Sequence, residues 1–100
     1  MTRTEEVSEL QRDFRLKRAQ LFPRQRYVLE FIERRSAQQP DASEADVTNF
    51  LNKPKGDEGT YYRLETLRLL DFLEMTDKGH GYGTIRYGLS PRYREYLSQI

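Results

Sequence analysis

The sequence contains no cysteine and only one histidine, His80. Without cysteine it can form neither a disulfide framework nor a thiolate metal site, and it has no cysteine nucleophile. A single imidazole also argues against a histidine-rich metal site. Because no nucleophile–base pair or phosphate-binding loop stands out either, we expect a protein that is not an enzyme and that needs no metal or cofactor.

Long apolar runs are missing as well. The apolar runs, such as Leu69-Leu70 and Phe72-Leu73, are far too short to span a bilayer. The first six residues are mostly polar and lack the apolar stretch of a secretory signal. These features predict a cytoplasmic protein without a membrane partner, and no separate sensor region for a small-molecule effector is visible.

The net charge of +1 over 100 residues does not by itself indicate a polyanionic partner. The charges are nevertheless unevenly distributed along the chain. Residues 41–58 carry five acidic and two basic side chains, a balance of −3, whereas residues 78–100 carry four basic and one acidic, a balance of +3. One face can therefore be basic, and only that face matters for contact with phosphates.

Apolar spacing and capping residues predict a mainly α fold with a small β-hairpin. Ser43 and Asp57 are expected to cap helices, and residues 41–42 to form a linker. Leu69 is expected to widen the buried stripe of the helix over 58–70. The expected helices cover 5–21, 24–38, a short segment after Ser43, 58–70 and 91–97, and the expected strands cover 72–76 and 84–89, joined by a glycine-rich turn at 79–83.

Residues 59–67 read Gly-Thr-Tyr-Tyr-Arg-Leu-Glu-Thr-Leu, which resembles the GTLYRxLxxL segment of PadR-type regulators and the TVYRxL segment of Fur-type regulators. Asp71 stands where such helices usually end in glycine. The resemblance covers roughly residues 24–97 and implies a winged helix-turn-helix domain. It also implies that residues 59–70 form a recognition helix for the major groove and that the hairpin lies over phosphates.

Several side chains are candidates for DNA contact in this arrangement. Leu64 and Leu67 should face the core, and we expect Tyr61 to join them. For Arg63 and Arg86, the competing interpretation is a solvated arginine without a ligand. The predicted DNA-binding residues are Lys53, Lys55, Thr60, Tyr62, Arg63, Thr66, His80 and Arg86. Asp57 and Glu58 argue against DNA, because carboxylates at this helix end repel phosphates.

Residues 1–22 form an amphipathic helix outside the minimal winged-helix plan, which covers 23–100. Its apolar residues suit either packing on its own domain or pairing with a second copy, and we expect pairing, hence a homodimer. The residues of this expected dimer seam are Val7, Leu10, Phe14 and Leu21.

Together these features predict a sequence-specific double-stranded DNA-binding protein that regulates transcription. The alternative is a winged-helix module that assembles with other proteins and does not bind DNA. The near-zero net charge and the acidic 41–58 stretch favour that alternative.

Overall fold

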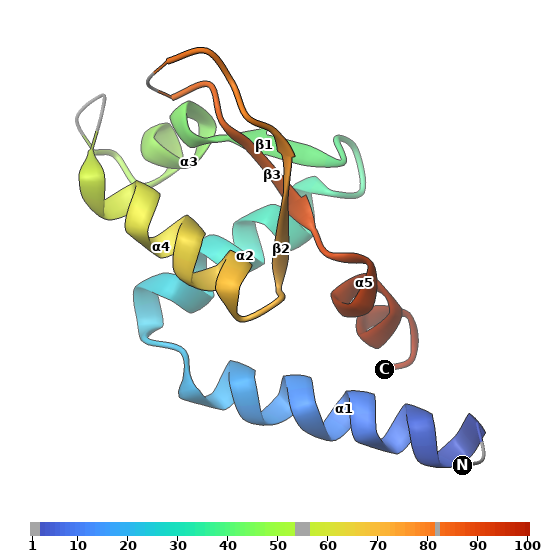
Figure 1. The fold of residues 1–100 in the computed structure, drawn as a ribbon. Helices are drawn as coiled ribbons and strands as arrows, with labels where there is room; N and C mark the ends of the chain where they lie inside the picture. Colours follow the sequence, from blue (N-terminus) through green and yellow to red (C-terminus); the bar gives the residue numbers. More distant parts are fainter. Residues whose placement is uncertain (1–2, 54–56, 82) are drawn as a thin grey trace.

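The computed structural model describes residues 3–53, 57–81 and 83–100. It confirms the predicted class, mainly α with a small antiparallel sheet (Figure 1). In chain order, the elements of the described residues are α1 (Arg3–Gln20), α2 (Pro23–Arg35), β1 (Asp41–Ser43), α3 (Glu44–Phe50), α4 (Glu58–Leu69), β2 (Leu73–Asp77), β3 (Arg86–Leu89) and α5 (Pro91–Ser98).

The sheet has three strands, where the sequence predicted a two-stranded hairpin. The expected linker at 41–42 is part of β1, which pairs antiparallel with β3 and places Ala42 opposite Tyr87. β2 pairs with the other edge of β3, so the strand order is β1-β3-β2. This layout, with helices α2, α3 and α4 around the sheet, is consistent with a winged helix-turn-helix plus an extra N-terminal helix.

The predicted helix starts are confirmed by their caps. The Ser43 hydroxyl accepts a hydrogen bond from the Asp46 N–H (3.1 Å), and the Asp46 carboxylate accepts one from the Ser43 N–H (3.0 Å). Asp57 accepts from the Thr60 N–H at the start of α4 (3.0 Å). These side chains satisfy amides that have no partner inside the helix.

Helix α2 ends at Arg35, three residues earlier than predicted, and residues 36–38 form a turn. The Ser36 hydroxyl donates to the Glu33 carbonyl (2.7 Å). A short polar side chain that hydrogen-bonds to nearby backbone offers the chain an alternative to continued helix. Apolar spacing carries no information about this local competition.

Left-handed backbone occurs at Asn52 after α3 (φ 56°), in the turn after α4 and in the hairpin. Asp71, directly after α4, has a φ of 68°, so it adopts the conformation that glycine usually provides at such a helix end. In the hairpin, Gly79 has a φ of 70°, and a Cβ there would lie 2.3 Å from the Thr84 hydroxyl oxygen. Glycine is therefore needed at position 79, whereas aspartate is accommodated at position 71.

The prediction of a dimer seam on α1 is wrong for the side chains that the structure describes. Leu10, Phe14 and Leu21 are all buried in the protein's own core. The Phe14 ring lies 5.1 Å from that of Tyr93 and 5.5 Å from that of Phe72, centroid to centroid. Packing on its own domain, the competing interpretation, is what these contacts show.

Val7 belongs to the same predicted seam, but its side chain lies outside the described part of the chain. The homodimer stays a prediction, and three of its four predicted contact residues are buried in the protein's own core.

A polar cluster ties α1 to the rest of the molecule next to these rings. Arg18 donates hydrogen bonds to Glu33 (2.5 Å) and to the Tyr93 hydroxyl (2.6 Å), and that hydroxyl donates to Glu33 (2.6 Å). Burial, helped by the hydrogen bond to Glu33, raises the pKa of Tyr93 well above its ordinary value. The cluster joins α1, α2 and α5, so α1 is fixed in position by both apolar and polar contacts.

Candidate functional site

Helix α4 has one face in the core and one in solvent. Leu64 and Leu67 are fully buried, as predicted, and they hold the helix against the domain. On the outer side, Tyr62 is 63% exposed and Thr66 is half-buried. The structure thus places Tyr62 and Thr66 where a partner can reach them.

The outer face of α4 is more apolar than the sequence predicted. Leu69, expected to widen the buried stripe, is 75% exposed. Tyr61, expected in the core, is 39% exposed, and its ring meets that of Tyr62 edge-on at 5.6 Å. Both predictions are wrong because the buried stripe runs through Thr60, Leu64 and Leu67. At 100° per residue, Tyr61 lies at the flank of this stripe and Leu69 lies opposite it.

Thr60 lies inside the domain and is only 1% exposed. Its backbone N–H and its hydroxyl both donate to the same carboxylate oxygen of Asp57, each at 3.0 Å. The side chain therefore completes the helix cap and has no surface to offer a phosphate or a base. Thr60 is not part of the exposed site.

Arg68 and Glu65, on the same helix, form an ion pair with each other. The Arg68 guanidinium donates two hydrogen bonds to the Glu65 carboxylate, both of 2.9 Å, and the Tyr87 hydroxyl donates a third of 2.8 Å. These hydrogen bonds, that of Arg68 foremost, lower the pKa of Glu65. The network joins α4 to β3 and fixes the orientation of α4 on the sheet.

Arg86, the predicted wing contact, is bound within the domain. Its guanidinium donates two hydrogen bonds to one carboxylate oxygen of Asp41 (2.7 and 2.9 Å), across the β1–β3 pair. The side chain remains 35% exposed, so a ligand could reach it only in competition with Asp41. The sequence contains no local signal for this pair, because 45 residues separate its members.

The Asp41–Arg86 pair should make stability depend on pH. Hydrogen bonds from Arg86 and Thr76 hold the pKa of Asp41 below its usual value of 3.8. A lowered folded-state pKa contributes stability above the unfolded pKa, and that stability is lost as pH falls through the folded value. We expect urea unfolding at pH 6 and pH 3 to show a smaller acid loss in Asp41→Asn than in wild type. Glu95→Gln, at an exposed position on α5, is the matched control and should lose as much as wild type.

The remaining predicted contacts lie around the ends of α3 and the hairpin. Lys53, after α3, is half-buried, and His80 is exposed in the hairpin turn, where its backbone N–H donates to the Thr84 hydroxyl (2.8 Å). Lys55 lies outside the described residues. In Figure 1 the N-terminal end of α4 and the hairpin tip lie at the same end of the molecule, away from α1. The structure thus brings α4 and the hairpin to one end.

Arg63 follows the exposed Tyr62 on α4. It is half-buried, with 21% of its side chain exposed, and one guanidinium nitrogen lies 3.9 Å from an Asp57 carboxylate oxygen. Arg63 is therefore neither an openly presented cation nor a tightly bound one.

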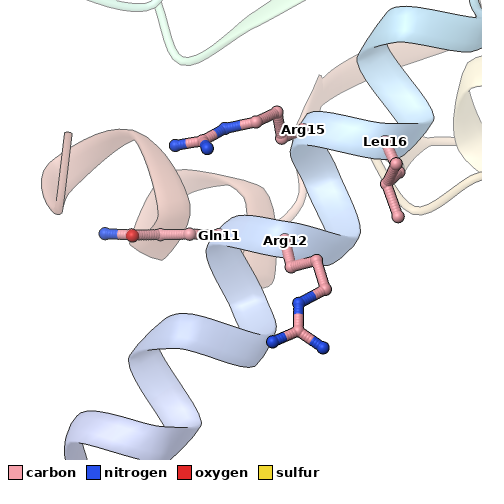
Figure 2. Close-up of a pocket in the computed structure, with 4 residues that line it drawn as sticks. All are labelled: Gln11, Arg12, Arg15 and Leu16. Carbon is pink, nitrogen blue, oxygen red and sulfur yellow. The ribbon is translucent and has the colours of Figure 1, made fainter.

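A small depression lies on the opposite end of the molecule, on α1, and is lined by Gln11, Arg12, Arg15 and Leu16 (Figure 2). Arg12, Arg15 and Leu16 are all exposed, so α1 carries cations outside the predicted site. These residues lie outside the apolar stripe from which the helix was predicted, so the sequence pattern did not indicate them. All four come from one helix, and the depression brings no distant parts of the chain together.

The described residues show no other feature that identifies a ligand. No three acidic or histidine side chains among them gather closely enough to hold a metal ion. None of the described helices has the length and apolar character needed to cross a membrane. Comparison of the chain with protein-family models, with curated proteins and with solved structures found no match.

Proposed function

We propose that this protein binds double-stranded DNA through α4 and the β2–β3 hairpin and that it acts as a sequence-specific transcriptional regulator. Two features together carry the proposal: α4 has one buried and one exposed face, and the sheet that follows it has the strand order β1-β3-β2. Leu64 and Leu67 anchor α4, while Tyr62 and Thr66 lie on its outer side. The N-terminal end of α4 lies at the same end of the molecule as the hairpin (Figure 1).

The dimensions support this arrangement. A helix of 12 residues is about 18 Å long, and the major groove, about 12 Å wide, admits one α-helix. A tyrosine hydroxyl and a threonine hydroxyl both bond phosphates or base edges, and the threonine methyl can also contact a thymine methyl. The Thr66 hydroxyl donates to the Tyr62 carbonyl (2.8 Å), so in this rotamer it can accept a hydrogen bond from a base amino group and would have to rotate to donate to a phosphate.

Few cations are available at this surface, so the electrostatic part of binding should be modest. Lys53, Lys78 and Arg63 are the candidates for phosphate contact among the described residues. Three contacts would give a slope of about −2.7 in a plot of log affinity against log salt, since each contributes about −0.9. Raising the salt fourfold should then weaken binding by about 40-fold.

A titration of labelled random duplexes at about 50 and 200 mM salt tests the proposal. We expect saturable binding at low salt that weakens by the factor above, and selection of bound duplexes should enrich one sequence pattern. Absence of binding to any duplex at low salt would refute DNA binding. Binding with no enrichment would refute sequence specificity only.

A protein-assembly module is the second candidate, favoured by the composition of the same helix face. Tyr61 and Tyr62 are exposed next to Leu69, which is 75% exposed, and the acidic Glu58 lies beside them. Exposed aromatic and leucine side chains at helical spacing are typical of helix-in-groove contacts between proteins. In that case the affinity for a protein partner would fall in Leu69→Ser, and the wild-type protein would bind no duplex at low salt.

A further inference from the structure

Arg63 lies folded back over the first turn of α4 in a position that satisfies its guanidinium poorly. The nitrogen Nη1 is buried and forms no hydrogen bond among the described residues. Its nearest counter-charge is the Asp57 carboxylate oxygen at 3.9 Å, too far for a hydrogen bond. A buried guanidinium N–H that has lost water without gaining an acceptor is costly, so this position is only weakly stable.

Gly59 provides the space for this folded position. A Cβ built at Gly59 would lie 3.2 Å from Nη1 of Arg63 and 3.6 Å from its Cζ. Gly59 lies within α4 and has an ordinary helical backbone, so no turn requires glycine there. Glycine in a helix costs about 1 kcal/mol of stability relative to alanine. The space that Gly59 leaves for the Arg63 guanidinium is a physical reason for glycine at this position.

Asp57 holds Arg63 weakly because its carboxylate already accepts hydrogen bonds from Thr60. The same oxygen, Oδ2, accepts both hydrogen bonds from Thr60 that cap α4. Arg63 therefore meets an acceptor that is already used, at long range and without the two parallel hydrogen bonds that arginine forms with a free carboxylate or phosphate. A DNA phosphate would offer Arg63 a better partner than Asp57 does.

The position of Arg63 on the helix indicates a phosphate rather than a base as that partner. Residue 63 lies at the flank of α4, between exposed Tyr62 and fully buried Leu64. When a helix occupies the major groove, its central exposed side chains meet the bases, and its flanks face the backbones that border the groove.

We infer that Asp57 holds the Arg63 side chain against Gly59 in the free protein, and that Arg63 changes rotamer to bind a backbone phosphate when a duplex docks on α4. We call this Asp57–Arg63 contact the latch. This inference rests on the proposed DNA binding. The stored contact must be broken before Arg63 can bind, so Asp57 lowers the affinity for DNA. The latch also removes one cation from the surface of the free protein, which limits non-specific attraction to polyanions.

Asp57→Asn tests the latch, with Glu58→Gln as its matched control. Asparagine caps a helix about as well as aspartate, so the start of α4 should be preserved. Both variants remove one negative charge from adjacent residues, and Glu58 is exposed. Both should therefore gain the same general attraction to DNA. The latch predicts that Asp57→Asn gains about threefold more affinity than Glu58→Gln, with unchanged thermal unfolding in both.

The background Arg63→Ala completes the experiment. There the latch predicts that the added Asp57→Asn and Glu58→Gln changes raise the affinity for the same labelled duplex equally. If the two changes act equally in the wild-type background, the latch is refuted and DNA binding stands. If Asp57→Asn retains its extra gain without Arg63, Asp57 acts on DNA directly and the latch is again refuted. If the wild-type protein binds no duplex at low salt, the proposed function fails and the latch with it.

Discussion

Replacing Phe14 by alanine is expected to lower the free energy of unfolding by about 3–5 kcal/mol, the usual cost of removing a buried aromatic ring. Phe14 is fully buried and contacts the rings of Phe72, Tyr93 and Tyr96 at 5.1–5.5 Å between centroids. The loss comprises both the transfer free energy of the ring and the cavity that remains among three other rings. Because small domains are stable by only about 5–15 kcal/mol, such a loss approaches the whole stability.

Leu16→Ala on the same helix is the matched control. Leu16 is 58% exposed, so its removal should change the free energy of unfolding by no more than about 0.5 kcal/mol. Urea unfolding followed by circular dichroism measures both variants. Equal, small losses would mean that α1 does not pack on the core as described. A loss in Phe14→Ala that grows with protein concentration would instead indicate that Phe14 belongs to an interface between copies.

The error about α1 shows what apolar spacing can and cannot predict. The spacing of Leu10, Phe14 and Leu21 correctly predicted a helix with one buried side. The same stripe fits a second copy and the protein's own core equally well, because periodicity records which side is buried and not what covers it. The covering surface is built by Phe72, Tyr93 and Tyr96, far away in the sequence.

The missed strand β1 has a similar cause. Three residues, Asp41–Ser43, are too few to show an alternating pattern, and two of them are polar. Their pairing with β3 is long-range, and the Asp41–Arg86 hydrogen bonds span it. Local patterns identified the helices, their caps and the hairpin, whose signals lie within a few residues. Contacts between distant segments came from the structure alone.

The candidate site was predictable in outline for the same reason. The sequence resemblance and the leucine spacing placed Tyr62 and Thr66 on the outer side of α4, where the structure has them. The state of the charged residues was not predictable. Of the predicted cations, Arg86 is bound by Asp41 and Arg63 is folded toward Asp57, and the neighbouring Arg68 is bound by Glu65. A count of basic residues therefore overestimates what this surface can offer a phosphate.

Thr66→Glu is expected to reduce affinity for duplex DNA by about 100-fold or more. The substitution places a carboxylate on the outer face of α4, half-buried beside Tyr62, where the proposal puts the floor of the major groove. Like charges brought together at an interface cost several kcal/mol, and about 1.4 kcal/mol corresponds to a factor of ten. Glutamate is also a good helix former, so α4 should remain intact.

Gln20→Glu is the control for the change in net charge. It adds the same carboxylate at an exposed position at the end of α1, a helix that is not part of the proposed DNA-binding surface. General repulsion from DNA should therefore weaken binding by only about two- to threefold, since an exposed charge that does not touch the DNA is largely screened by salt. Titration of both variants with one duplex at low salt separates the two effects. Equal losses would mean that DNA senses net charge and not α4, and they would refute the placement of this helix in the groove. A large loss in Thr66→Glu alone, with thermal unfolding unchanged, would locate the DNA contact on the outer face of α4, opposite the buried Leu64 and Leu67.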